Sequence, residues 1–405
     1  MTSHTRLPND MIWAIIEELN DDTHILATCA SVCRSWYNFS QPRRFRHIKL
    51  APHDRFNRFH HIIADSPHVA SFVESLELSV SIFMPEYEMN DMGASAIQLP
   101  SKDITMLSDI LSCLTKVQRF VLRGSSVTWD HLPQFVRSAI LTFLRLNSPS
   151  FLELSHWMFL PGRSELRNLI RQPLALAELA LFALDVAESD VPIPTSPEAR
   201  DSEVGAVNLN RISPPSMSVY SCNRVRDWLL QEDCIIDISS VRHLKLLCDH
   251  PLASDILKLA GSTLETLRCY CFSVPETIDL SHNPHIKDLT LVSWMAFVDC
   301  KLSVPTALIP SLETISPSND IRILRLMFNT TTYPHTAFGG SWAQLVATLA
   351  SATFRSLRRL EMLLCSYEPE YRLHEAMVKA SLGKLGIELV VMFANNSKGR
   401  PDEWD

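Results

Sequence analysis

The sequence predicts a mixed protein of the α+β or α/β class, in which a small N-terminal cluster of helices precedes a long array of strand–turn–helix units. Two observations predict this. Apolar residues recur at helical spacing before residue 40. From residue 73 onward, a short apolar-x-apolar phrase, as a buried parallel strand requires, returns many times. Apolar residues make up 46% of the 405 residues, so most of the chain is expected to fold.

The first expected helix follows Leu7 and Pro8. Pro8 suits the opening turn, where its missing N–H has no helical partner to lose. The apolar residues behind it are spaced by one, three or four positions, which places them on one face of a helix. This stripe consists of Met11, Ile12, Ile15, Ile16 and Leu19.

A second helix is expected after Asp21 and Asp22, because an acidic side chain can cap the first N–H groups of a helix. Pro42 is expected to end it. Helices this short seldom bury enough apolar surface to be stable alone, so they need a partner or a host domain. The apolar positions of this helix are Ile25, Leu26, Cys29 and Ala30, continued by Val32, Cys33, Trp36 and Phe39.

The string Leu7-Pro8-x-Asp10-Met11-Ile12-x-x-Ile15-Ile16-x-x-Leu19, followed by Val32-Cys33-Arg34-Ser35-Trp36, resembles the F-box over about residues 5–46. The resemblance implies an F-box domain at residues 5–50 that docks on a Skp adaptor and, through it, on cullin and RING subunits. An N-terminal helical hairpin packed on its own domain is the alternative. The positions that would contact the Skp adaptor are Leu7, Pro8, Met11, Ile12, Ile15, Leu19, Leu26, Val32, Cys33 and Trp36.

The remainder of the chain carries the repeated strand phrase. Helical spacing between the phrases completes a strand–turn–helix unit, which must stack on its neighbours to cover its apolar face. The helical stretches are 165–170, 225–230, 252–260, 342–349 and 373–382. The phrases are Leu76-Glu77-Leu78, Phe120-Val121-Leu122, Leu144-Arg145-Leu146, Leu179-Ala180-Leu181, Leu244-Lys245-Leu246, Thr263–Cys269, Leu289-Thr290-Leu291, Leu324-Arg325-Leu326, Leu360-Glu361-Met362 and Leu389-Val390-Val391.

Residues 70–393 therefore resemble an irregular leucine-rich-repeat domain, which implies a solenoid that binds a substrate protein. A regular repeat has a buried Asn or Cys after its strand, and Cys248, Cys269 and Cys271 are candidates for that position. The alternative is a generic α/β domain with a parallel sheet. Residues 187–218, with five prolines and many acidic side chains, predict a disordered insertion, and 394–405 a flexible tail. Residues 85–103 predict a second loop.

Composition narrows the function classes. A net charge of −8 and a pI near 6.0 argue against nucleic-acid binding, which requires a concentrated basic face. No stretch is apolar and long enough to predict a signal peptide or a membrane span. Ten cysteines without a C-x-x-C pair fit reduced, mostly buried thiols. We expect an intracellular protein of the cytoplasm, the nucleus or both.

The sequence contains no motif for catalysis, so no catalytic residue, cofactor or metal is predicted. No phosphate-binding glycine loop and no G-x-S-x-G elbow occurs. His60 and His61 are adjacent and seldom converge on one ion, and Cys29 and Cys33 are better explained as packing residues.

The predicted function is a non-catalytic substrate receptor of an SCF-type (Skp–cullin–F-box) ubiquitin ligase, whose substrate the sequence does not identify. Two other hypotheses remain open. One is a repeat scaffold that binds proteins without a role in degradation. The other is an enzyme whose active site carries no recognised motif.

Overall fold

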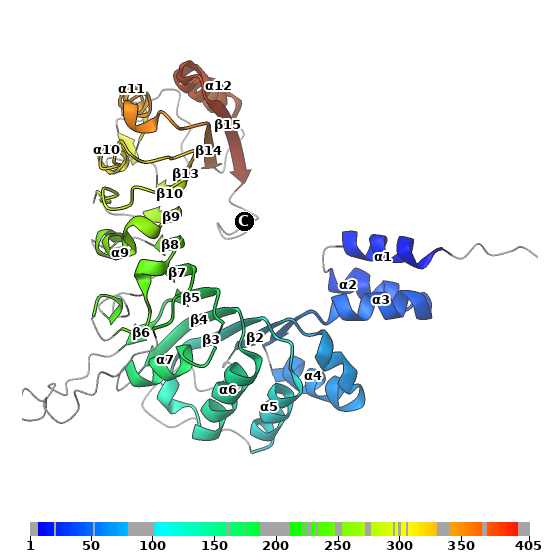
Figure 1. Ribbon diagram of the computed structural model, residues 1–405. Helices are drawn as coiled ribbons and strands as arrows, with labels where there is room; N and C mark the ends of the chain where they lie inside the picture. The colour runs from blue at the N-terminus through cyan, green and yellow to red at the C-terminus, as the bar shows by residue number, and fades with distance from the viewer. Residues whose placement is uncertain are drawn as a thin grey trace, which may run out of the picture. The chain divides into compact units, whose positions relative to one another are not determined.

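The computed structural model describes residues 7–19, 22–51, 53–79, 101–159, 163–173, 175–186, 211–220, 234–247, 253–271, 277–294, 296–298, 301–304, 307–329, 341–366 and 371–395, with a few further positions between 222 and 231. The chain divides into two compact units, Met1–Ala206 and Val207–Asp405. An N-terminal helical region precedes a mixed domain of helices and parallel strands (Figure 1).

Three helices open the chain: α1 (Asn9–Glu18), α2 (Thr23–Ala30) and α3 (Arg34–Arg44). Asp22 is the N-cap of α2, as predicted, and its carboxylate accepts the N–H groups of His24 at 2.9 Å and Ile25 at 3.0 Å. α3 packs against both α1 and α2. The helices α1 and α2 thus both pack on α3.

The single second helix that the sequence predicted is in fact two. α2 ends at Ala30, and Cys33 adopts an extended backbone before α3 begins. Pro42 does not end the run, because α3 continues to Arg44. A proline in the last turn of a helix removes only one intrahelical hydrogen bond, and the chain tolerates this loss two residues before the helix ends.

The first unit contains a parallel sheet in which the strands follow one another in chain order, β1-β2-β3-β4-β5, with the short β6 beside β4. Parallel neighbours need a crossover connection, and helices provide most of these connections. The elements are β1 (His47–Leu50), α4 (His53–Asp65), the 3-10 helix η1 (Pro67–Phe72), β2 (Ser75–Ser79), α5 (Ser101–Cys113), β3 (Arg119–Thr128), η4 (Trp129–His131), α6 (Gln134–Asn147), β4 (Phe151–Phe159), α7 (Arg163–Ile170), β5 (Glu178–Phe182) and β6 (Asp185–Val186).

Apolar side chains in register form the core of this unit. Leu76 pairs with Phe120, Phe120 with Leu152, and Leu152 with Leu179, and all four are fully buried. Burial of one such side chain stabilises the fold by roughly 1.5–3 kcal/mol. The register of the predicted apolar-x-apolar phrases therefore aligns neighbouring strands.

One predicted strand was wrong. Leu144-Arg145-Leu146 lies in α6, whose buried residues Val136, Ile140, Phe143 and Leu144 recur at helical spacing. The strand of this unit is β4, which starts at Phe151. Because three residues with two leucines fit either period, only the longer apolar pattern distinguishes a helix from a strand here.

Gly124 in β3 is a position where a side chain has no room. A Cβ there would lie 2.5 Å from the carbonyl oxygen of His156 and 2.5 Å from the ring of Trp157. Trp157 is fully buried, and its indole N–H donates to the Leu122 carbonyl at 3.0 Å. β3 and β4 can approach this closely only because residue 124 is glycine.

We expect Gly124→Ala to lower the free energy of unfolding by about 1–3 kcal/mol, the usual cost of overpacking. Urea denaturation checks this. Gly383→Ala is the matched control, since no described atom lies within 4 Å of its Cβ position, and it should leave stability unchanged or raise it slightly. Equal stability of the two variants would contradict the close approach of β3 and β4.

The second unit repeats the same arrangement. Its parallel strands run in the order β7-β8-β9-β10-β13-β14-β15, and β11 and β12 form a separate antiparallel hairpin. α11 lies between α10 and α12 and contacts both. The elements are β7 (Ser216–Tyr220), η6 (Ile238–Ser240), β8 (His243–Leu247), α9 (Ala253–Ala260), η7 (Gly261–Thr263), β9 (Thr266–Cys271), β10 (Asp288–Trp294), β11 (Ala296–Val298), β12 (Lys301–Ser303), α10 (Leu308–Glu313), β13 (Ile323–Asn329), α11 (Ser341–Leu349), η8 (Ala352–Phe354), β14 (Arg359–Ser366), α12 (Tyr371–Leu382), η9 (Gly383–Leu385) and β15 (Glu388–Asn395).

A repeated backbone contact joins successive strands of this unit. The carbonyl of Arg242, just before β8, accepts the N–H groups of Glu265 and Thr266 at 2.9 Å, and the carbonyl of Glu265 accepts those of Lys287 and Asp288. The same contact recurs before β13 and β14. Within the second unit, each of these strands is therefore hydrogen-bonded to the next through the backbone just before the strand begins.

Two buried asparagines, Asn283 and Asn319, join successive segments of the second unit through their side-chain amides. Asn283 is fully buried, and its amide donates to the carbonyls of Leu257 at 2.8 Å and Gly261 at 2.9 Å. The Asn319 amide donates to the Asn283 carbonyl at 2.8 Å. The sequence analysis proposed cysteines for this role. Of these, Cys269 is buried within β9, and Cys248 lies outside the described residues.

The other predicted strand phrases fall in β2, β3, β5, β8, β9, β10, β13, β14 and β15, which confirms them. The predicted helices at 165–170, 252–260, 342–349 and 373–382 are confirmed by α7, α9, α11 and α12. Most of the predicted insertion lies outside the described residues, but 216–218 belong to β7. Of the predicted loop at 85–103, the described part, 101–103, is the start of α5.

Candidate protein-binding surfaces

Exposed apolar side chains gather on the N-terminal helices. Among the described residues, ten large apolar side chains are exposed, and seven of them lie between residues 7 and 37. These seven, with exposed fractions of 40–63%, are Leu7, Met11, Trp13, Ile15, Ile25, Val32 and Tyr37. So many exposed apolar side chains on a short stretch of the chain make it a candidate site of contact with another molecule.

The ten residues predicted to contact a Skp adaptor fall into two groups. Six are exposed: Leu7, Pro8, Met11, Ile15, Val32 and Cys33. The other four hold the helices together. Ile12 and Leu26 are buried in one cluster with Ile16, and the partly buried Leu19 and Trp36 pack against it.

The helical cluster positions the exposed group. Met11 and Ile15 are four residues apart and share one flank of α1, while Ile12 and Ile16 occupy the adjacent buried stripe. An ion pair between Glu17 of α1 and Arg43 of α3, 3.1 Å apart, spans the cluster. Val32 precedes α3 in the break that separates it from α2 and is 63% exposed.

Three exposed apolar residues of this region were not among the predicted contacts. Trp13 lies on α1 outside the apolar stripe, and Ile25 and Tyr37 are exposed on α2 and α3. A large apolar residue that interrupts the polar face of a predicted helix is the signal that would have found Trp13.

A second candidate surface is a groove on the sheet of the second unit, with a volume of about 490 Å³. Alternate residues of neighbouring strands line it, so its side chains form two rows across the sheet. One row is polar and consists of Lys245, Arg268, Thr290, Arg325 and Glu361. The next row of the sheet is apolar and consists of Tyr270, Val292, Met327, Leu363 and Met392, of which the last three line the groove.

Arg325 organises the polar row. Its guanidinium binds Asp288 at 2.5 Å and Glu361 at 2.7 Å, and Arg359 approaches the other oxygen of Glu361 at 2.7 Å. Partial burial disfavours the charge of Arg325, but the hydrogen bonds and attraction of the two carboxylates outweigh this and raise its pKa above the usual value. Arg325 therefore stays charged and engages both acidic groups of the groove.

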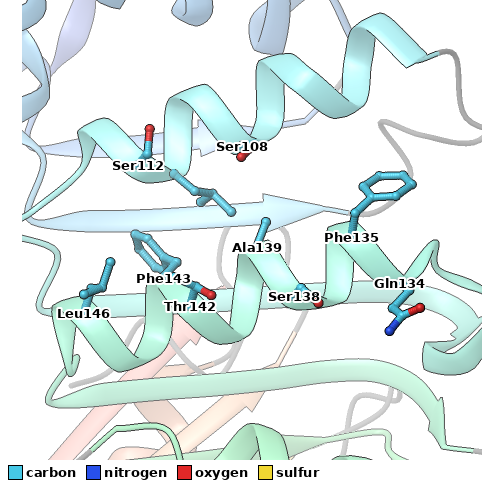
Figure 2. A pocket seen from close by; sticks show the side chains of 10 residues that line it. Ser108, Ser112, Gln134, Phe135, Ser138, Ala139, Thr142, Phe143 and Leu146 are labelled. Atoms are coloured by element: carbon cyan, nitrogen blue, oxygen red, sulfur yellow. The ribbon is translucent and has the colours of Figure 1, made fainter.

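A third surface lies between α5 and α6, with a volume of about 520 Å³. Figure 2 shows Phe135 and Leu146 toward the two ends of α6, with the hydroxyls of Ser108 and Ser112 projecting from α5. Ser138 and Thr142 add further hydroxyls from α6. Its described lining is thus a mixture of hydroxyl, amide and apolar groups.

The histidines considered for metal binding do not converge. The rings of His60 and His61 are 6.0 Å apart in an edge-to-face arrangement, and His60 Nε2 lies 3.5 Å from Asp109. Over the ranges that the structure describes, no three His, Cys, Asp or Glu side chains gather as a metal site requires. In the same ranges, the helices include none that is long and apolar enough to cross a bilayer.

The N-terminal helices thus expose apolar side chains, and a parallel-sheet domain with a groove follows them in the chain. The family model of the COS11 F-box domain matches residues 5–82. The match supports an F-box protein, and F-box domains in general bind a Skp-type adaptor. No curated protein sequence matches the chain.

The matched region extends beyond residue 50, the expected end of the F-box. Residues 51–82 contain α4, η1 and β2. α3 contacts η1, and Arg46 Nε binds Glu74 at 2.7 Å. The helical cluster is thus continuous with the first strands of the sheet.

Proposed function

We propose that this protein is the substrate-recognition adaptor of an SCF-type ubiquitin ligase. The F-box helices dock on the Skp adaptor, which bridges to the cullin and RING subunits, and the sheet domain binds a target protein. It acts inside the cell, in the cytoplasm or the nucleus, and has no catalytic residue of its own.

The observation that carries the proposal is the apolar surface at residues 7–37. Six of the ten sequence-predicted contact residues are exposed on it, although the cluster has a core of its own. An apolar surface of this kind is exposed to water, and a partner that covers it stabilises it. The F-box match at residues 5–82 favours a Skp-type adaptor as that partner.

The sheet domain, residues 70–393, is proposed to be a leucine-rich-repeat-like solenoid. Chain-order parallel strands within each unit, the backbone contact before each strand and the buried Asn283–Asn319 link support this. In such a sheet, the outward-facing residues of neighbouring strands form rows of side chains that a bound protein can contact. The groove on β8–β15 is the proposed place for the substrate.

The mechanism is proximity. An adaptor that holds a substrate beside a charged ubiquitin carrier raises the effective concentration of the reacting lysine. No group of the adaptor needs to take part in bond formation.

Reconstitution tests this proposal. The full-length chain is mixed with purified Skp-type adaptor, cullin and RING subunit, and the products are separated by size-exclusion chromatography. We expect the four proteins to elute together. A complex with the Skp adaptor that does not recruit cullin would instead favour a scaffold without a role in degradation, and absence of any complex would refute the proposed adaptor function.

A further inference from the structure

Cationic side chains line one edge of the sheet in the second unit. The residues directly before β8, β9, β10, β13 and β14 are joined by the repeated backbone contact, so they form a row across the strands. Four of the five are cations, and all four cations are exposed. We call this set the basic row; it consists of Arg242, Glu265, Lys287, Arg322 and Arg358.

The backbone contact does not require these cations. In the first unit the same contact precedes the strands, and the carbonyl of Arg46 accepts the N–H groups of Glu74 and Ser75. The residues before β1 to β5 are one cation, one anion and three uncharged residues, and the two charged ones, Arg46 and Glu74, bind each other at 2.7 Å. That row has no net charge, so the fold alone does not explain the basic row.

The basic row instead places like charges side by side. Lys287, Arg322 and Arg358 precede three strands that are neighbours in the sheet, β10, β13 and β14. Like charges on neighbouring strands destabilise a sheet. A negatively charged partner would remove this repulsion.

Two carboxylates of this edge are already bound. Glu265 accepts Lys287 Nζ at 2.7 Å, and Asp320 accepts the guanidinium of Arg322 at 2.6 Å. These hydrogen bonds are the main reason that the pKa of each carboxyl group lies below its usual value, and the charges of Arg242, near Glu265, and Arg358, near Asp320, lower it further. Both carboxylates are therefore ionised at neutral pH.

The two outer arginines remain available. Within the described part of the chain, neither Arg242 nor Arg358 forms an ion pair. Four cations and the two carboxylates Glu265 and Asp320 leave the edge with a net charge of +2, in a chain whose net charge is −8. The excess positive charge is at the two ends of the basic row.

From this distribution we propose that the basic row binds an extended acidic segment of a target protein, whose Asp or Glu side chains contact Arg242 at one end and Arg358 at the other. The inference rests on the proposed function, because it names a chemistry by which the sheet domain recognises its target. The row borders the groove, whose lining includes the first residues of β8, β9 and β10, namely His243, Thr266 and Asp288.

The pattern of charges favours a polypeptide over a nucleic acid or a membrane. A nucleic acid carries a phosphate on every nucleotide and requires a continuous basic face, whereas Glu265 and Asp320 interrupt this one. The net charge of −8 also opposes the approach of a polyanion or an anionic bilayer. A polypeptide can place single carboxylates opposite the free arginines and neutral residues between them.

Strand spacing sets the distance between the acidic residues. Arg242 and Arg358 are four strand intervals apart in the order β8-β9-β10-β13-β14. Neighbouring strands are about 4.7–4.9 Å apart, so the ends of the row are separated by about 19–20 Å. An extended chain covers about 3.3–3.6 Å per residue. The two acidic positions of the segment are therefore about five to six residues apart.

Selection of a displayed library of random dodecapeptides on the immobilised full-length protein tests the proposal. We expect enrichment of peptides with acidic residues at this spacing, and their affinity should fall as salt is added. The chain beyond Asn395 contains Asp402, Glu403 and Asp405, so the selection is repeated on a chain that ends at Asn395. Enrichment of the motif by either form supports the proposal, and its absence from both overturns it.

Matched double variants locate the binding site. Arg242→Glu with Arg358→Glu reverses the charge at both ends of the basic row and should weaken a selected peptide about tenfold or more. Arg145→Glu with Arg171→Glu changes the net charge equally at exposed positions of the first unit and should weaken it less than about twofold. Both melting temperatures should stay within about 2 °C of the unaltered chain. Equal affinities of the two double variants would show that the basic row is not the site.

Other polyanions are tested on the same protein. Polyuridylate RNA and vesicles that contain phosphatidylserine are titrated against the unaltered chain at about 0.15 M salt, and we expect neither to bind. If either binds through Arg242 and Arg358 while no acidic peptide is enriched, the proposal is wrong and the row recognises a nucleic acid or a membrane.

Failure of the inference is distinguishable from failure of the proposed function. Each preparation is also assayed for binding to the purified Skp-type adaptor, which depends on residues 7–37 and not on the basic row. A chain that binds the adaptor but selects no acidic peptide retains the proposed function and refutes the assignment of the basic row alone.

Discussion

Replacing Met11, Ile15 and Val32 together with aspartate is expected to weaken binding of a purified Skp-type adaptor at least 100-fold. These side chains are 40–63% exposed, so each has substantial apolar area left to bury, roughly 1 kcal/mol at the usual coefficient. An aspartate at the interface adds the cost of desolvating a charge. A loss of about 3 kcal/mol corresponds to a factor of about 100 in affinity. Isothermal titration calorimetry measures it.

Three large apolar residues that are exposed in the described part of the chain beyond the N-terminal helices provide the control. Phe135, Leu146 and Leu259 have exposed fractions of 43–73%, and their replacement with aspartate changes charge and hydropathy equally. This control triple variant should bind the adaptor as the unaltered chain does. Circular dichroism should show an unchanged melting curve for both. If the two triple variants bind alike, the surface at residues 7–37 is not the docking site.

Replacing Asn283 with leucine is expected to lower the free energy of unfolding by about 2–5 kcal/mol. Its amide satisfies the carbonyls of Leu257 and Gly261, and the variant leaves both without this donor. Each buried polar group that loses its partner costs about 1–3 kcal/mol. The measurement is urea denaturation, followed by hydrogen exchange to locate the loss around α9 and the segment before β10.

Two further variants serve as comparisons for Asn283→Leu. Asn319→Leu removes a single described bond, to the Asn283 carbonyl, and should cost about half as much. Asn168→Leu changes an exposed asparagine of α7 and should cost less than about 0.5 kcal/mol. If Asn283→Leu lowers the free energy of unfolding as little as Asn168→Leu does, the buried Asn283 amide does not hold the segments of the second unit together.

Nine strands of the sheet domain were predictable because each carries an apolar-x-apolar phrase, whereas β1, β4 and β7 were not among the predicted strands. The prediction failed where the phrase was ambiguous. Leu144-Arg145-Leu146 has a strand-like triplet, yet the buried positions of the whole segment have helical spacing. The break between α2 and α3 was missed because Val32 and Cys33 continue the apolar pattern through a point where the backbone is extended.

The candidate site was predicted in composition but not in detail. The sequence identified the apolar residues of the N-terminal helices, but it did not separate the buried Ile12 and Leu26 from the exposed Met11 and Val32. Which flank of a helix is covered depends on how the helices pack, and periodicity alone does not contain that information. The groove was not predicted. Its rows of side chains depend on the register between strands that are adjacent in the sheet but far apart in the sequence.

Hydroxyl-radical footprinting of the unaltered chain, with and without purified Skp-type adaptor, tests the central claim most directly. Met11, Trp13 and Tyr37 are exposed and carry side chains that oxidise readily, so they report on the surface at residues 7–37. We expect oxidation of Met11 to fall strongly on addition of the adaptor, while oxidation of Phe135 stays constant. Equal oxidation of Met11 in the presence and absence of saturating adaptor would contradict docking through this surface.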